Sequence, residues 1–217
     1  MLKLLPLVLG LAMQTSARAQ APRILYISRE FWKPGHDATL NRIEAEAARV
    51  CIGLGVPHPY LGIESLTGSK EVWYINGFAS TEELSQITEA YNKQQELLAA
   101  MNRFAQQRAA FESEPHREGS ATYRPELSRG AEWKMGQDRF LVIAVTKGNP
   151  HSDGPVFESQ DGVRFVVTTA KSRAEADAKL AAAGPDAKVF AVRPEFSMPA
   201  AEWVASDPSF WHSKSQK

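Results

Sequence analysis

The stretch Ile24–Ala48, ILYISREFWKPGHDATLNRIEAEAA, decides the fold, because it predicts a strand, a tight turn and an amphipathic helix in that order. Residues 24–32 are rich in β-branched and aromatic side chains, and Pro34-Gly35 ends this strand. Asp37 can cap a helix, whose apolar residues recur at helical spacing: Leu40, Ile43, Ala47, Val50, Cys51 and Leu54. Cys51 is the only cysteine, so no intramolecular disulfide can form, and we interpret it as an inert core thiol.

A second stretch, Glu71–Leu84 (EVWYINGFASTEEL), predicts a strand that runs into a capped helix. Together with Tyr60–Ser65, its first half predicts a hairpin turned by residues 66–70. The sequence Ser80-Thr81-Glu82-Glu83 is a capping box that starts the helix. About thirty residues of helix would span about 45 Å, which exceeds a small sheet, so we expect a kink or an overhang that a second subunit covers. The apolar stripe of this helix comprises Leu84, Ile87, Tyr91, Leu98, Met101, Ala105, Arg108 and Phe111.

The remaining chain predicts a long connection and then more strands. Residues 113–138 are polar and contain two prolines and three glycines, which predicts a long loop and the best internal boundary. Residues 139–146 (RFLVIAVT) are apolar on both faces and predict a central strand. A strand at 163–169, a helix at 172–183 and a strand at 188–193 follow. We therefore predict a unit over 20–112, the loop over 113–138, and a segment over 139–217 that completes the sheet or barrel.

Residues 1–19 are typical of a cleavable secretory signal peptide. Lys3 precedes an apolar run over 4–13, and Ala17-Arg18-Ala19 supplies the cleavage pattern before Gln20. The run is too short to be a retained anchor, and no later run approaches the about 20 residues of a membrane helix. We expect a bacterial protein that is exported, periplasmic or secreted, without membrane contact once the signal is removed.

Charge and motifs exclude several classes of function. The 25 basic and 25 acidic residues balance, which argues against binding to nucleic acid. No two of the five histidines lie at the spacing of a local metal site, so we predict no metal. No phosphate loop, dinucleotide fingerprint or nucleophile elbow occurs, so we predict no cofactor and assign no catalytic residue.

The predicted element order is β-α-β-β-α-β followed by β-α-β, an α+β arrangement of the ferredoxin-like kind with an antiparallel sheet. Over residues 23–146, and above all in the two stretches quoted, the chain resembles the dimeric α/β-barrel superfamily, which includes antibiotic-biosynthesis-monooxygenase-like and NIPSNAP-like domains. The resemblance implies sheets paired into a barrel, a homodimer, an apolar or mixed cavity, and ligands such as small aromatic molecules or haem. The final β-α-β is alternatively a degenerate second copy that builds a barrel within one chain.

The faces of the first two strands supply most of the candidate ligand-binding residues. Tyr26, Ser28 and Glu30 alternate along the first strand, and Tyr60 and Glu64 share one face of the second. If the two sets meet, they form an aromatic and carboxylate lining, in which burial raises the pKa of a carboxyl and makes it a general base. The alternative is an exposed sheet face, or a salt bridge to a nearby arginine.

Two further candidates are single side chains. His58 lies between two prolines, which can hold its imidazole at the mouth of a strand, although the sequence favours a rigid loop with an incidental histidine. Trp73 and Tyr74 point to opposite faces of their strand, so one faces the helices and the other is available to a cavity. Trp73 would stack on flat apolar ligands, or belong to the ordinary core.

The leading functional hypothesis is an exported protein that binds a small, mostly apolar ligand, with catalysis unproven. The alternative is a non-catalytic homodimeric interaction module that uses the long second helix and the aromatic tail residues Trp203, Phe210 and Trp211. A third hypothesis is a cofactor-independent oxygenase or a haem-handling enzyme.

Overall fold

In the computed structural model, which describes residues 22–130, 133–148 and 153–212, the first half of the chain forms a complete ferredoxin-like unit. Its elements are β1 (Ile24–Trp32), α1 (Asp37–Gly53), β2 (Leu61–Ser65), β3 (Glu71–Phe78), α2 (Thr81–Lys93), α3 (Gln95–Ala109) and β4 (Glu112–Tyr123). Every pairing in its sheet is antiparallel, and the strand order is β4-β1-β3-β2. The ferredoxin-like fold predicted from the sequence is therefore confirmed.

The second half repeats the strand order of the first. Its elements are β5 (Phe140–Thr146), β6 (Val156–Ser159), β7 (Arg164–Ala170), α4 (Arg173–Ala183) and β8 (Ala187–Val192), and their order is β8-β5-β7-β6. When the strands of each half are numbered one to four along the chain, their order across the sheet is four, one, three, two in both halves. The described residues between β5 and β6 form no helix, whereas α1 occupies the same position in the first half. The second half is thus a reduced copy of the first.

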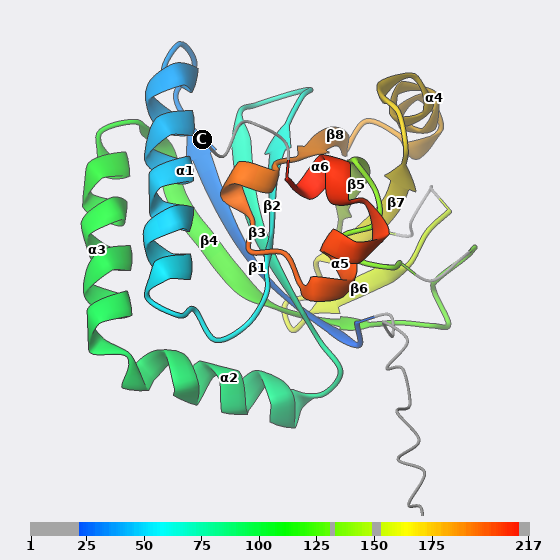
Figure 1. The fold of residues 1–217 in the computed structure, drawn as a ribbon. Helices are drawn as coiled ribbons and strands as arrows, with labels where there is room; N and C mark the ends of the chain where they lie inside the picture. The colour runs from blue at the N-terminus through cyan, green and yellow to red at the C-terminus, as the bar shows by residue number, and fades with distance from the viewer. Residues whose placement is uncertain (1–21, 131–132, 149–152, 213–217) are drawn as a thin grey trace, which may run out of the picture.

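The two half-sheets close into one eight-stranded barrel within a single chain (Figure 1). One seam pairs β2 with β8, where Ile63 lies opposite Val192. The other pairs β4 with β6, where Ala121 lies opposite Ser159. Of the two arrangements left open by the sequence, the structure has the one in which both barrel halves come from the same chain.

The barrel is filled with apolar side chains. Because side chains alternate along a strand, Leu25 and Ile27 of β1 point inward, where Trp73 of β3 packs on Phe190 of β8 at a centroid distance of 4.8 Å. The last elements of the chain, η1 (Pro194–Phe196), α5 (Ala201–Ser206) and α6 (Pro208–Trp211), add to the same core. Trp203 and Trp211 are buried in it, and Phe210 packs against it. These tail aromatics therefore stabilise the barrel and do not form an exposed partner surface.

The helices cover the two halves unequally. Figure 1 shows α1 and α3 side by side over the first half, with α2 crossing below them, while α4 covers the second half alone. The predicted kink in the long helix is confirmed as a break at Gln94, which separates α2 from α3. Ser80 accepts the capping hydrogen bond from the Glu83 amide, as the capping box predicts.

The prediction of a loop over 113–138 is wrong for residues 113–123, because these belong to β4. This strand has few buried side chains, and its pairing with β1 holds it in the sheet. β4 completes the first unit, so that the strand near 139–146 opens the second unit. The short strand β6 was not predicted. The predicted signal peptide over 1–19 and its cleavage before Gln20 lie outside the described residues.

No helix among the described residues is both long and apolar enough to cross a membrane.

Candidate functional site

A cavity of about 470 Å³ lies between the outer face of the first half-sheet and the three helices that cover it. Its floor comes from β1, β3 and β4, and its walls come from α1, α2, α3 and the chain between α1 and β2. The cavity is therefore outside the barrel, on the side of the sheet that faces left in Figure 1. Its size falls within the range typical of small-molecule sites.

The period of a strand explains the polar floor. Tyr26, Ser28 and Glu30 alternate with the inward residues of β1, so all three face the helices and line the cavity. On β3, Tyr74, Asn76 and Phe78 follow the same rule. Tyr60 at the entrance to β2 and Glu118 on β4 complete this surface.

The helices supply an apolar wall. Ala47, Ala48 and Cys51 recur on one face of α1, and Leu84, Ile87 and Tyr91 recur on one face of α2. Leu98, Met101 and Phe104 do the same on α3. No residue of α2 is fully buried, so its apolar face is directed at the cavity and not at a packed core.

One end of the cavity holds a cluster of charged side chains. The guanidinium of Arg108 on α3 lies 3.4 Å from Glu30 Oε1 and 3.3 Å from Glu44 Oε2 on α1. The hydroxyl of Tyr74 donates a hydrogen bond to Glu44 Oε2. Glu30 Oε2, Glu44 Oε1 and Arg108 Nε are buried without a hydrogen-bond partner in the structure. One guanidinium therefore serves two carboxylates and leaves one oxygen of each unsatisfied.

Burial changes the proton affinities of this cluster. Desolvation raises the pKa of Glu30 and of Glu44 above the ordinary value, against the attraction of Arg108. The negative charge of Glu30 raises the pKa of Glu44 further by repulsion. Burial and then a hydrogen bond to Glu118 raise the pKa of Tyr26 to about 12. The tyrosines thus stay protonated, and the carboxyl pair keeps a proton to higher pH than an exposed carboxyl does.

Four of the seven residues predicted as ligand-binding lie together at this cavity. Tyr26, Ser28, Glu30 and Tyr60 all line it. Their juxtaposition follows from the alternation of β1 and from the position of Tyr60 beside Tyr74, where the two rings meet edge to face at 5.9 Å.

The other three predicted residues lie elsewhere. His58 contacts the Gly77 carbonyl oxygen through Nε2 at 3.0 Å and stacks on the outer side of the site against Phe78. Glu64 is buried between Lys70 and Arg193 in ion pairs, so its carboxylate is already neutralised. Trp73 belongs to the barrel core, where its indole N–H donates to Glu71 Oε2 at 2.7 Å. None of the three is among the residues that line the cavity.

The sequence interpretation missed Glu44, Glu118 and Tyr91, and gave Arg108 no role. A signal for the first was present, because Glu44 lies four residues after Leu40 and so interrupts an apolar helix stripe with a charge. Arg108 interrupts the stripe of α3 in the same way. Glu118 gave no such signal, because it lies in the segment predicted as a loop.

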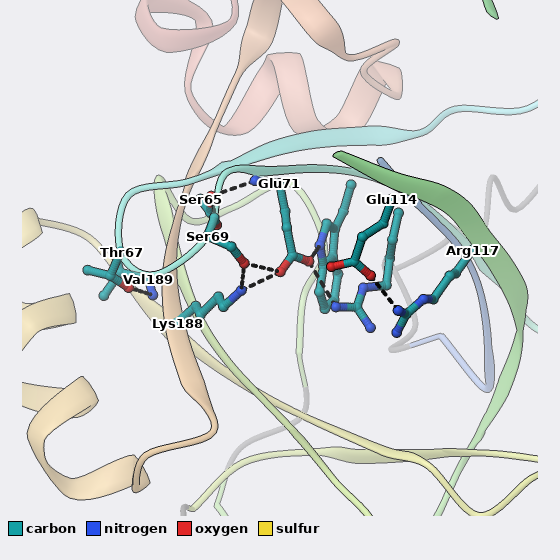
Figure 2. A network of polar contacts seen from close by, with 10 residues as sticks. Ser65, Thr67, Ser69, Glu71, Glu114, Arg117, Lys188 and Val189 are labelled. Carbon is teal, nitrogen blue, oxygen red and sulfur yellow. Dashed lines mark hydrogen bonds and ion pairs between the residues drawn. The ribbon is translucent and has the colours of Figure 1, made fainter. Parts of the chain in front are cut away.

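A second buried carboxylate network surrounds Glu71 at the start of β3. Figure 2 shows Glu71 beside Ser69 and Lys188. The other oxygen of Glu71 accepts from Arg29 at 2.8 Å and from Trp73. Burial alone would raise the pKa of Glu71, but the hydrogen bonds from Lys188 and Arg29 together lower it. With both oxygens satisfied, this network is structural.

Within the described residues, no three His, Cys, Asp or Glu side chains are grouped so that they could hold a metal ion. Four of the five histidines are described, and they lie apart from the carboxyl pair, except that His116 on β4 acts on Glu30 through its charge. His151 lies outside the described residues.

Comparison with known proteins gives likeness in fold only. No protein-family model and no curated protein matches the chain. An anthrone oxidase-like protein shares 10 % identity and a TM-score of 0.48, over 81 % of this chain and 93 % of that protein. A candidate monooxygenase from Fusobacterium nucleatum shares 11 % identity and a TM-score of 0.45, over 79 % and 93 %. A candidate antibiotic biosynthesis monooxygenase from Nitrosomonas europaea shares 10 % identity and a TM-score of 0.34, over 48 % and 91 %.

These solved structures are of the kind that the sequence resemblance named, and the likeness stays at the level of the fold. The strand order of this chain establishes that fold by itself. No activity follows from it, because one fold hosts many unrelated functions.

Proposed function

We propose that this protein binds a small, mostly apolar molecule that carries a hydrogen-bond donor, in the cavity between the first half-sheet and α1, α2 and α3. The observation that carries the proposal is the pairing of an apolar helix wall with two buried carboxylate oxygens that lack a partner. A buried acceptor without a donor costs free energy, and a ligand that donates to it recovers that cost.

The same cavity supports proton abstraction as a second candidate function. A carboxyl whose pKa is raised by burial is a competent general base, and Glu30 combines such a pKa with an unpartnered oxygen and a place in the cavity lining. A cofactor-independent reaction that begins with loss of a proton from the ligand is consistent with this group. Haem binding has no supporting observation among the described residues.

Export and homodimer formation remain proposals of the sequence. The first rests on residues 1–19 and is tested by the N-terminal sequence of the mature protein. The second has lost part of its basis, because Tyr91, Leu98 and Met101 of the helix stripe line the cavity and Phe111 packs against the cluster around Trp32. Met101 remains 43 % exposed, so the stripe is covered only in part within one chain, and light scattering tests the dimer directly.

The binding proposal is tested with naphthylmethanol, a flat apolar molecule with one hydroxyl donor. We expect calorimetry to show one binding site per chain for the native protein. Thr88→Trp, which places a bulky ring on the cavity face of α2, should weaken binding at least about tenfold by steric exclusion. Ser85→Trp is the matched control, because Ser85 is exposed on the same helix and does not line the cavity.

Equal binding by both tryptophan variants and the native protein would place the ligand elsewhere and contradict the proposal.

A further inference from the structure

Aromatic side chains gather at this cavity to an unusual degree. Four of the five tyrosines of the chain line it, namely Tyr26, Tyr60, Tyr74 and Tyr91. They come from four different elements, and each ring has a face that carries negative partial charge. Aromatic faces attract cations, and sites for amines and quaternary ammonium groups use this attraction.

The charged groups at the cavity are predominantly acidic. Among the described lining residues, Glu30, Glu44 and Glu118 carry carboxyls, and Arg108 alone carries a positive charge. Glu30 is 5 % exposed and Glu44 is 1 % exposed, and each has one oxygen without a partner. Arg108 reaches both carboxylates only at long distances of 3.3 and 3.4 Å, so it does not satisfy either fully. Three carboxyls therefore share one guanidinium among the described lining residues, and acidic groups outnumber basic ones.

We propose, resting on the proposed function, that the ligand is an organic cation, a protonated amine attached to an apolar body. Its ammonium group pairs with the carboxylate of Glu30, and its apolar body lies against Ile87 and Leu98, which line the same cavity. An ammonium supplies several donors and a full charge in a small volume, which a hydroxyl does not.

Proton release accompanies the binding of such a ligand. Glu30 is faced by Arg108 from α3, by Glu44 from α1, and by Glu112, His116 and Glu118 from β4. Because burial raises its pKa, the free protein holds a proton there over a wider pH range than an exposed carboxyl does. A bound cation favours the ionised carboxylate, lowers its pKa and expels that proton. Affinity for the amine therefore rises with pH through the pKa of the free site.

The test compares naphthylmethylamine with naphthylmethanol, which share a skeleton and differ in charge. We expect the amine to bind the native protein about tenfold more tightly near neutral pH, because hydrogen bonds to ionised groups are stronger than neutral ones. Calorimetry in buffers of different ionisation enthalpy should show that protons are released on amine binding and not on alcohol binding.

Glu30→Gln should abolish the preference for the amine while the alcohol still binds. Glu89→Gln is the matched control, because it removes one exposed carboxylate from α2 outside the cavity, and it should keep the preference. If Glu30→Gln fails to fold, Glu118→Gln replaces it, because Glu118 is exposed and lines the same cavity, and it should reduce the preference in the same direction.

The outcomes separate the two proposals. Equal affinities for amine and alcohol in the native protein would overturn the cation and leave the binding cavity in place. Binding of neither compound would overturn both. A preference for the amine that survives in Glu30→Gln and Glu118→Gln would also overturn the inference, since the charge would then be recognised elsewhere.

Discussion

Glu30 and Glu44 are the residues at which stability and function oppose each other most directly. Both are buried carboxyls, both share one guanidinium, and both have an elevated pKa because of burial. A core that served stability alone would replace them with apolar side chains of similar volume. Their retention at a cavity is the main residue-scale argument for a functional site.

Replacement of Glu30 by glutamine should make the stability of the protein less dependent on pH. The folded-state pKa of Glu30 is raised above 4.5, so the native carboxyl adds stability below pH 4.5 that is lost as pH rises through the folded-state pKa. Glutamine carries no such proton. The difference in free energy of unfolding, variant minus native, should therefore increase from acid to alkaline pH in urea denaturation.

The Glu89→Gln variant should show a constant difference over the same pH range, because Glu89 is exposed. A constant difference for Glu30→Gln as well would mean that Glu30 titrates normally in the folded protein.

Loss of Arg108 should be costly. Its side chain is 13 % exposed and lies between two buried carboxylates, so Arg108→Gln leaves both without their cation. Removal of one partner from a buried ion pair typically costs about 3–5 kcal/mol. We expect a loss of that size in the free energy of unfolding near neutral pH, and a smaller loss in acid, where the carboxyls are protonated.

Arg49→Gln is the control for this measurement, because Arg49 is exposed on α1. Losses that are equal for the two variants would show that Arg108 contributes only as a surface charge.

At the scale of elements, β2 depends on the absence of a side chain at Gly62. A Cβ built there would lie 2.6 Å from Phe196 Cβ and 2.7 Å from the Phe196 carbonyl oxygen, and the Gly62 amide donates to Ser197 Oγ at 2.8 Å. Gly62→Ala must therefore displace η1, at a cost of about 1–3 kcal/mol in the free energy of unfolding. Thermal and urea denaturation measure this loss.

Gly119→Ala on β4 is the matched control, since a Cβ there meets nothing within 4 Å. We expect it to be neutral or slightly stabilising. A Gly62→Ala variant as stable as Gly119→Ala would show that η1 moves freely against β2.

The elements that could be predicted from the sequence are those with a local pattern. β1 and β3 have β-branched and aromatic residues, and the start of α2 has a capping box, so residue order alone located them. β4 has no alternation of apolar and polar residues, because both of its faces are largely exposed over residues 113–119, and only its pairing with β1 makes it a strand. Pairing of that kind joins residues far apart in the chain and leaves no local trace.

The candidate site was also predictable only where a local sequence pattern placed its residues. Alternation along β1 placed Tyr26, Ser28 and Glu30 on one face, and the structure brings Tyr60 to them. The same rule placed Glu64 with Tyr60, but Lys70 and Arg193 neutralise Glu64 beyond the cavity. Which face of the sheet carries a cavity depends on how helices pack over it, and this cannot be read from the period of a strand.

For the whole molecule, the closed barrel predicts that neither half is stable alone. The first unit separated from the second would expose the edges of β2 and β4, and the second would expose those of β6 and β8. Unpaired edges promote association. Residues 22–124 and 125–212, expressed as two chains, should each aggregate or self-associate, and should form one folded complex when refolded together.

Size-exclusion chromatography with circular dichroism tests this prediction. Two halves that each elute as a folded monomer would show that the seams β2–β8 and β4–β6 add little to stability. A pair of fragments divided within α4 is the control. These fragments should not form a folded complex, because the division lies inside the second unit.

The position of the cavity outside a filled barrel has a consequence for how this protein can evolve or be engineered. On β1, Leu25 and Ile27 determine how well the barrel packs, while Tyr26 and Ser28 on the opposite face determine what the cavity admits. In many proteins, a mutation that changes a binding site also lowers stability. Here the residues that pack the barrel and the residues that line the cavity lie on opposite faces of the same strand. Under the proposed function, substitutions at the outward positions can therefore change which ligand binds, while the residues that pack the barrel stay the same.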